Sequence, residues 1–90
     1  MTLSVGDEKE AHMASKAYVL IEGAAGTIPG IKHKVTQMKG VKTCHAVTGQ
    51  YDLVALVEGD NPNTIGKLSF TEIQRLDGVL RTLTCNVIDL

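Results

Sequence analysis

The chain has 90 residues, with nine lysine or arginine and ten aspartate or glutamate residues, and its formal net charge is −1. Because no basic stripe is present, direct binding to nucleic acid has no electrostatic basis. No apolar run approaches the roughly 20 residues that cross a bilayer, and no signal-peptide pattern is present. We therefore expect one cytoplasmic domain that does not contact a membrane.

The first sixteen residues differ from the rest, because they are polar and show no hydrophobic period. They contain His12-Met13 just before Ala14-Ser15, a pattern that a cloning junction often leaves. We expect residues 1–16 to be a disordered leader or a cloning remnant. Residues 17–90 should form the folded domain.

The first half of that domain predicts a strand, a helix and a second strand. An apolar run over residues 17–21 indicates the first strand. The helix should begin after Thr27 as its N-cap and end at Gly40, which favours left-handed backbone geometry. The second strand follows over residues 41–48, and the side chains expected on one of its faces are Val41, Thr43, His45 and Val47.

The second half predicts the same three elements again. Gly49-Gln50 is typical of a two-residue hairpin turn, which leads into a strand over residues 51–58. Asn61 should cap the next helix, with Pro62 in its first turn. Gly78 ends that helix, and the last strand covers residues 79–88.

The order βαββαβ predicts an α+β, ferredoxin-like fold, in which an antiparallel sheet of order 4-1-3-2 carries both helices on one face. The central strands read Tyr18-Val19-Leu20-Ile21 and Leu53-Val54-Ala55-Leu56-Val57, without polar alternation. Both of their faces therefore favour burial, whereas the helices can cover only one. We expect a second copy to cover the other, giving a homodimeric α/β sandwich or barrel. Phe70 lies on the second helix outside the face expected to pack against the core. It is a candidate anchor for assembling dimers into a ring.

Residue types that could carry chemistry are few. Cys44 and Cys85 fall on opposite edge strands, so we expect neither a disulfide nor a shared metal, but two buried apolar thiols. His33 is expected in solvent, and His45 as an interface or core residue. No ligand spacing, nucleophile motif or phosphate-binding glycine pattern is complete. The sequence therefore predicts no metal site, no cofactor and no catalytic residue.

One constellation remains, namely Gly49-Gln50-Tyr51-Asp52 at the expected hairpin. As a structural feature, it is a turn in which Gly49 permits a positive φ and Asp52 bonds backbone amides. As a binding site, it would gather free amides, an amide side chain and a carboxylate. Those groups complement a small zwitterion such as an amino acid.

These residues resemble the effector domain of the Lrp/AsnC family, the RAM domain. The matching pieces are the Gly49–Asp52 hairpin, Leu76-Asp77-Gly78-Val79, and Thr82 with Thr84 in the last strand. The resemblance implies dimers formed through the sheets, rings of dimers (octamers or decamers), and an amino-acid effector bound where dimers meet. It implies a ligand-binding set of Gly49, Gln50, Tyr51, Asp52 and Thr84.

The chain departs from typical family members because its first sixteen residues cannot form a helix-turn-helix. The resemblance thus implies a stand-alone sensing and oligomerisation domain, with a full-length family member as a further partner. Two other functions stay open. One is a small dimeric ferredoxin-like enzyme of the monooxygenase or isomerase type, and the other is a passive oligomerisation module.

Overall fold

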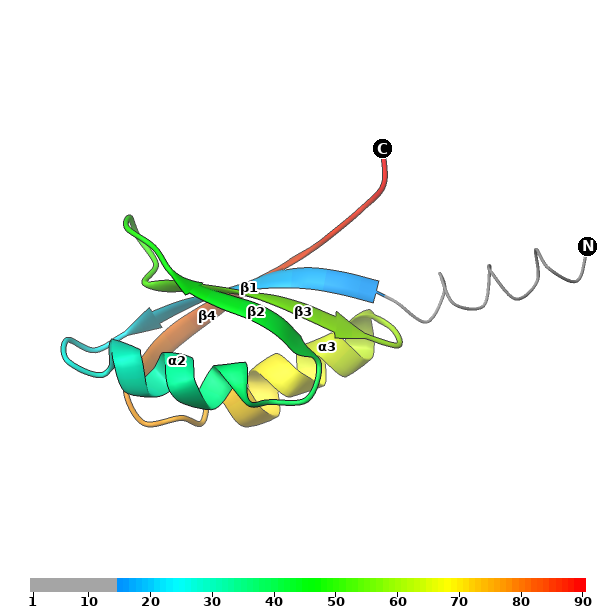
Figure 1. Ribbon diagram of the computed structural model, residues 1–90. Coiled ribbons are helices and arrows are strands. Elements are labelled where there is room, and N and C mark those ends of the chain that lie inside the picture. Colours follow the sequence, from blue (N-terminus) through cyan, green and yellow to red (C-terminus); the bar gives the residue numbers. More distant parts are fainter. Residues whose placement is uncertain (1–14) are drawn as a thin grey trace, which may run out of the picture.

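The computed structural model describes residues 15–90, so most of the expected leader lies outside the described residues. The elements follow in the predicted order, with a short π-helix, η1, added after the second α-helix (Figure 1). Their bounds are β1 Ser15–Gly23, α2 Ile28–Thr36, β2 Val41–Ala46, β3 Leu53–Gly59, α3 Pro62–Leu68, η1 Ser69–Ile73 and β4 Val79–Asn86.

The four strands form one antiparallel sheet of order β2-β3-β1-β4, which confirms the predicted ferredoxin-like topology. Strands β1 and β3 lie in the centre and pair from Ser15 opposite Gly59 to Ile21 opposite Leu53. Helices α2 and α3 lie together under one face of the sheet (Figure 1). The opposite face carries no helix of the described chain, and we call it the open face.

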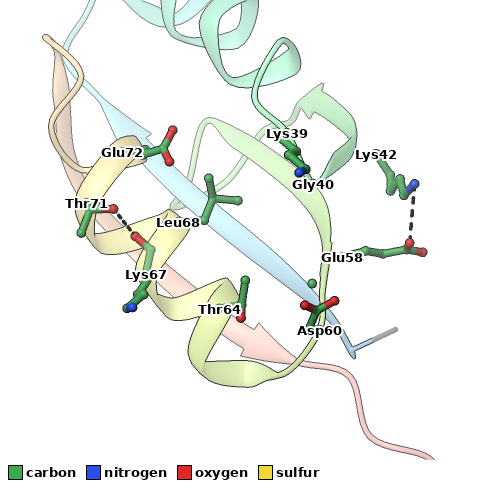
Figure 2. A pocket seen from close by; sticks show the side chains of 11 residues that line it. Lys39, Gly40, Lys42, Glu58, Asp60, Thr64, Lys67, Leu68, Thr71 and Glu72 are labelled. Carbon is green, nitrogen blue, oxygen red and sulfur yellow. Dashed lines mark hydrogen bonds and ion pairs between the residues drawn. The ribbon is translucent and has the colours of Figure 1, made fainter. Parts of the chain in front are cut away.

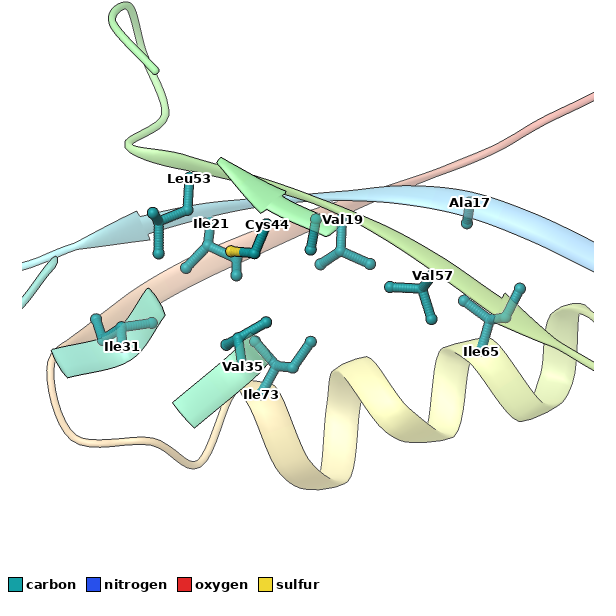
Figure 3. Close-up of a cluster of buried hydrophobic side chains, with 11 residues drawn as sticks. Ala17, Val19, Ile21, Ile31, Val35, Cys44, Leu53, Val57, Ile65 and Ile73 are labelled. Atoms are coloured by element: carbon teal, nitrogen blue, oxygen red, sulfur yellow. The ribbon is translucent and has the colours of Figure 1, made fainter. Parts of the chain in front are cut away.

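The hydrophobic core lies between the sheet and the two helices (Figure 3). Alternate residues of the central strands point into it, and each has 0% exposed surface: Ala17, Val19, Ile21, Leu53, Ala55 and Val57. Ile31 and Val35 of α2, Ile65 of α3 and Ile73 of η1 meet them from the helix side. Aliphatic side chains therefore fill this core, as the low aromatic content predicts.

The intervening residues of the same strands lie on the open face. Tyr18 and Leu83 are each 46% exposed, although both are large and apolar. Leu20, Val54 and Leu56 beside them are partly buried. The prediction that the central strands are apolar on both faces, and covered on one, is confirmed for residues 15–90.

Two local predictions in the β2–β3 region are wrong. The connection is not a two-residue turn, because β2 ends at Ala46 and β3 begins at Leu53. A register shift between Val41 and Thr43 also turns Val41 toward the core, whereas Thr43 and His45 face outward. One extra residue in a strand reverses the side-chain alternation beyond it, and a residue count cannot locate such a bulge.

The second helix starts as predicted but ends differently. The Asn61 side chain accepts a hydrogen bond of 2.9 Å from the Thr64 amide, which confirms the N-cap. After Leu68 the helix widens into η1, where the Gln74 amide donates to the Ser69 carbonyl at 3.0 Å. Such π-turns are rare, and they occur disproportionately beside functional sites.

Candidate functional site

The connection between β2 and β3, residues 47–52, rises away from the helix layer (Figure 1). We call it the effector loop. Its base is closed by a hydrogen bond of 2.9 Å from the Val47 amide to the Asp52 carbonyl. Gly49 at its tip has a φ of 118°, which lies in the region that only glycine adopts at little cost.

Asp52 fastens this loop to the neighbouring strand β1. Its amide donates to the Ile21 carbonyl at 2.9 Å, and its carboxylate oxygen Oδ2 accepts from the Gly23 amide at 2.9 Å. Asp52 is partly buried, whereas Gly49 and Gln50 are exposed. The carboxylate therefore holds the loop in place at its base, while the tip stays accessible.

The backbone amides of the loop tip are available to a ligand. The amides of residues 48–51 donate no hydrogen bond to an acceptor in the described part of the chain. Backbone N–H groups that converge in a loop form sites for anions such as a carboxylate. The members of the predicted grouping, namely free amides, the Gln50 side chain and the Asp52 carboxylate, thus belong to one loop.

Tyr51 connects the loop to the open face through Arg81 of β4. The guanidinium carbon of Arg81 lies 5.4 Å from the centroid of the Tyr51 ring, within the range of a cation–π contact. Arg81 Nε also donates to Glu22 Oε1 of β1 at 2.7 Å. The hydrogen bond to Glu22 raises the pKa of the Arg81 guanidinium above its ordinary value, so it stays charged.

Thr84 lies in a different environment from the effector loop. Its hydroxyl donates to Ser69 Oγ of η1 at 3.4 Å, and Ser69 Oγ lies 3.4 Å from Thr82 Oγ1. Gln74 Nε2 donates to Thr82 Oγ1 at 2.8 Å. These groups form a polar cluster between β4 and η1, on the covered side of the sheet.

The structure therefore brings together four of the five predicted site residues. Gly49, Gln50, Tyr51 and Asp52 share one loop, whereas Thr84 makes its side-chain hydrogen bond to η1. Sequence reasoning missed Arg81 and Glu22. Their opposite charges are visible in the sequence, but only the β1–β4 register places the two residues opposite each other.

The cysteines and histidines give no centre for chemistry in residues 15–90. Cys44 is buried, and burial raises the pKa of its thiol. The expectation that both thiols are buried is wrong for Cys85, which is exposed because it follows Leu83 on the open face. His33 is exposed on α2, as expected, and lies 3.2 Å from the Gln37 amide nitrogen. No group of three His, Cys, Asp or Glu residues in this range could hold a metal ion.

A cavity lies at the opposite end of β2 and β3 from the effector loop. It is a groove of about 740 Å³ between the sheet and α3 (Figure 2), and we call it the charged groove. Three lysines and three carboxylates line it, namely Lys39, Lys42, Lys67, Glu58, Asp60 and Glu72. This groove and the predicted loop thus lie in different parts of the molecule.

One carboxylate and one lysine of this groove already neutralise each other. Glu58 forms ion pairs with Lys42 at 3.5 Å and with Lys16 at 3.7 Å. No buried side-chain nitrogen or oxygen in the described residues lacks a hydrogen-bond partner, so none waits in the groove for a ligand. We therefore place the candidate site at the effector loop, where backbone donors have no partner among residues 15–90.

Within residues 15–90, no helix is both long enough and apolar enough to span a membrane.

Comparison with known proteins points to one family. The model of the Lrp/AsnC ligand binding domain matches residues 16–89. The HTH-type transcriptional regulator LysM of Sulfurisphaera tokodaii is 37% identical over 54 residues, which cover 60% of this chain and 38% of that regulator. The chain thus spans well under two thirds of this relative's length.

Solved structures share the fold. TTHA0845 from Thermus thermophilus superposes with a TM-score of 0.80 at 29% identity, covering 84% of this chain and 95% of that one. The transcriptional regulator NMB0573 from Neisseria meningitidis was solved as a complex with L-Met. It has a TM-score of 0.77 at 16% identity, and the match covers 89% of this chain and 53% of that one. At that identity, the second likeness shows the fold alone.

Proposed function

Because this chain belongs to the Lrp/AsnC ligand-binding domain family, whose model matches residues 16–89, we propose that it is an amino-acid-sensing domain that acts as a homo-oligomer. The observation that carries the proposal is the effector loop, whose tip offers amides that are unpaired in the described residues and whose base holds the Asp52 carboxylate and the Tyr51 ring. Amides suit the carboxylate of a zwitterion, and Asp52 Oδ1, which accepts no hydrogen bond from residues 15–90, can accept one from its ammonium.

We propose further that the effector is bound between copies of the chain. Within one chain, Thr84 donates to η1, while residues 49–52 lie at the end of the sheet. In this proposal, a ligand that contacts both places meets the effector loop of one copy and Thr84 of another. Differential affinity of the effector for two assemblies would then shift their populations, which is the physical basis of sensing.

The open face supports the proposed dimer. It carries a contiguous apolar set across three strands: Tyr18, Leu20, Val54, Leu56 and Leu83. Burying such side chains contributes roughly 1.5–3 kcal/mol each, which is large against a domain stability of about 5–15 kcal/mol. A second copy packed sheet to sheet would cover this set on both partners.

The proposed role is regulatory rather than catalytic, since the relatives are transcriptional regulators. The chain would act in the cytoplasm, and it would reach DNA through another chain, such as a full-length family member in a mixed assembly. Phe70, 70% exposed on η1, is the proposed contact through which dimers assemble into an octameric or decameric ring.

Calorimetric titration against the twenty amino acids, with mass measurement in parallel, tests the sensor. We expect at least one amino acid to bind and to change the assembly. Tyr51→Ala should weaken that binding, whereas Lys67→Gln in the charged groove should leave it unchanged. Loss of binding in the groove variant alone would move the site to the groove. Absence of binding and of any mass change would refute the sensor and leave a passive oligomerisation module.

The assembly is tested by adding a carboxylate to each contact surface. In Leu83→Asp, a two-fold interface would bury the new charge twice, at a cost of several kcal/mol per ion, so we expect monomers in sedimentation velocity. In Phe70→Asp we expect dimers that no longer form rings. Both positions are exposed in the single chain, so each variant should fold. A Leu83→Asp protein that stays dimeric would exclude the open face as the dimer interface.

A further inference from the structure

Arg81 lies against the effector loop with its charge oriented by two neighbours. Its Nε donates to Glu22 Oε1 at 2.7 Å, and its guanidinium carbon lies 5.4 Å from the Tyr51 ring centroid. Glu22 and Arg81 are register partners on adjacent strands, so rigid backbone holds both ends of this ion pair. The guanidinium is therefore positioned by a carboxylate on one side and by an aromatic ring on another.

The unused donors of Arg81 are its two terminal nitrogens. A guanidinium has five N–H groups, and the contact with Glu22 employs the one on Nε. No hydrogen bond from the terminal nitrogens to another described residue is present, and the side chain is 59% exposed. Those nitrogens form the planar fork that binds a carboxylate through two parallel hydrogen bonds.

A full positive charge near the carboxylate of a bound zwitterion would strengthen the binding that the loop amides provide. Asp52, the acidic group of the loop, is partly buried and would repel that carboxylate at close range. The loop amides supply partial positive charges, but a guanidinium supplies a full one. Because Arg81 contacts Tyr51, which directly precedes Asp52, a ligand ammonium at Asp52 can leave its carboxylate within reach of Arg81.

We propose that Arg81 binds the α-carboxylate of the effector through its terminal guanidinium nitrogens, with Glu22 as the positioning residue that orients the fork. This assignment rests on the proposed amino-acid-sensing function. It adds Arg81 as the residue that determines specificity for a ligand with a carboxylate. A ligand without a carboxylate, such as an amino-acid amide, loses this contact. The site thereby discriminates amino acids from their amides and from simple amines.

The test compares L-amino acids with their primary α-amides by calorimetry on the wild type, Arg81→Gln and Arg81→Lys. In the wild type, each amino acid that binds should do so more tightly than its amide. Hydrogen bonds to charged groups contribute enough that Arg81→Gln should lower amino-acid affinity about 10- to 100-fold. Its affinity for the amide should change less than about twofold, since the contact is absent there. Arg81→Lys keeps the charge but lacks the planar fork, so its amino-acid affinity should lie between those of the wild type and Arg81→Gln.

Arg75→Gln is the matched control, because Arg75 is the other arginine of the chain and is exposed. It should bind like the wild type. Glu22→Gln should lower amino-acid affinity about two- to fivefold, in line with the modest free energy of an exposed ion pair. Circular dichroism and the melting temperature check that each variant is folded.

Three results would overturn the assignment, and they differ from one another. If Arg81→Gln binds amino acids like the wild type, Arg81 does not bind the carboxylate, although the sensor stands. If Arg81→Gln loses amino acid and amide equally, Arg81 acts only by shaping the loop. If the wild type binds no amino acid at all, the proposed function fails, and the role of Arg81 fails with it.

Discussion

The two faces of the sheet are built from alternate residues of the same strands, yet they have opposite surroundings. Val19 and Ile21 of β1 are fully buried under the helices, whereas Tyr18, directly before Val19, is 46% exposed. Both sets are apolar, so composition does not distinguish them. The comparison teaches that residues 15–90 carry apolar surface on both faces of the sheet and cover only one of the two faces with helices.

The two cysteines lie on different faces of the sheet, and their labelling rates should show the largest difference between these faces. Cys44, 6% exposed, lies on the covered face, and Cys85 lies on the open face. Labelling of Cys44 requires the core to open, so at low protein concentration it should be slower than labelling of Cys85 by at least about 10³-fold. Reaction rates with a thiol reagent, measured on Cys44→Ala and Cys85→Ser, give the ratio.

The same experiment extends to the proposed dimer. As protein concentration rises through the dimer dissociation constant, labelling of Cys85 should slow, because a second copy covers the open face. Labelling of Cys44 should not follow that concentration dependence. A Cys44 that reacts as fast as Cys85 would contradict the tightly packed covered face.

Neighbouring substitutions on β1 compare the two faces directly. Ile21→Ala removes a fully buried side chain and should lower the free energy of unfolding by about 2–5 kcal/mol. Leu20→Ala removes a partly buried one and should cost about 1 kcal/mol in dilute protein. Urea denaturation at two protein concentrations measures both. Equal losses at high dilution would mean that the open face is covered within the single chain.

The smallest expected effect is a pH dependence from the covered face. Burial raises the pKa of the Cys44 thiol in the folded chain, so the folded state holds this proton more tightly than the unfolded state does. The stability that this proton contributes is fully present below the unfolded pKa of 9.0. It is lost as the pH rises through the pKa of the folded state. Stability should therefore fall with pH above 9.0, by at most about 1.4 kcal/mol per unit from this group.

Cys44→Ala isolates this contribution. In a Cys85→Ala background, the stability curves with and without Cys44 should run parallel at neutral pH and converge above 9.0. Thermal melts between neutral and alkaline pH supply the measurement. Parallel curves over the whole range would show that Cys44 is not desolvated in the folded chain.

Most of the candidate site could be predicted because it is local in the sequence. Residues 49–52 are adjacent, and a glycine beside polar residues between two apolar runs is enough to predict an exposed connection. The length of that connection was wrong, since strand ends depend on pairing between β2 and β3. Arg81 was missed for the same reason, because 59 positions separate it from Glu22 and no local pattern relates the two.

The sequence by itself determined the order of elements, and right-handed βαβ crossovers leave one sheet order compatible with it. It also determined that the central strands are apolar on both faces. The tertiary structure alone decided which side chains emerge on each face near the bulges, and hence the exposure of Cys85 and the pairing of Arg81 with Glu22. The physical reason is that side chains alternate with period two, so a single register shift reverses every later side chain.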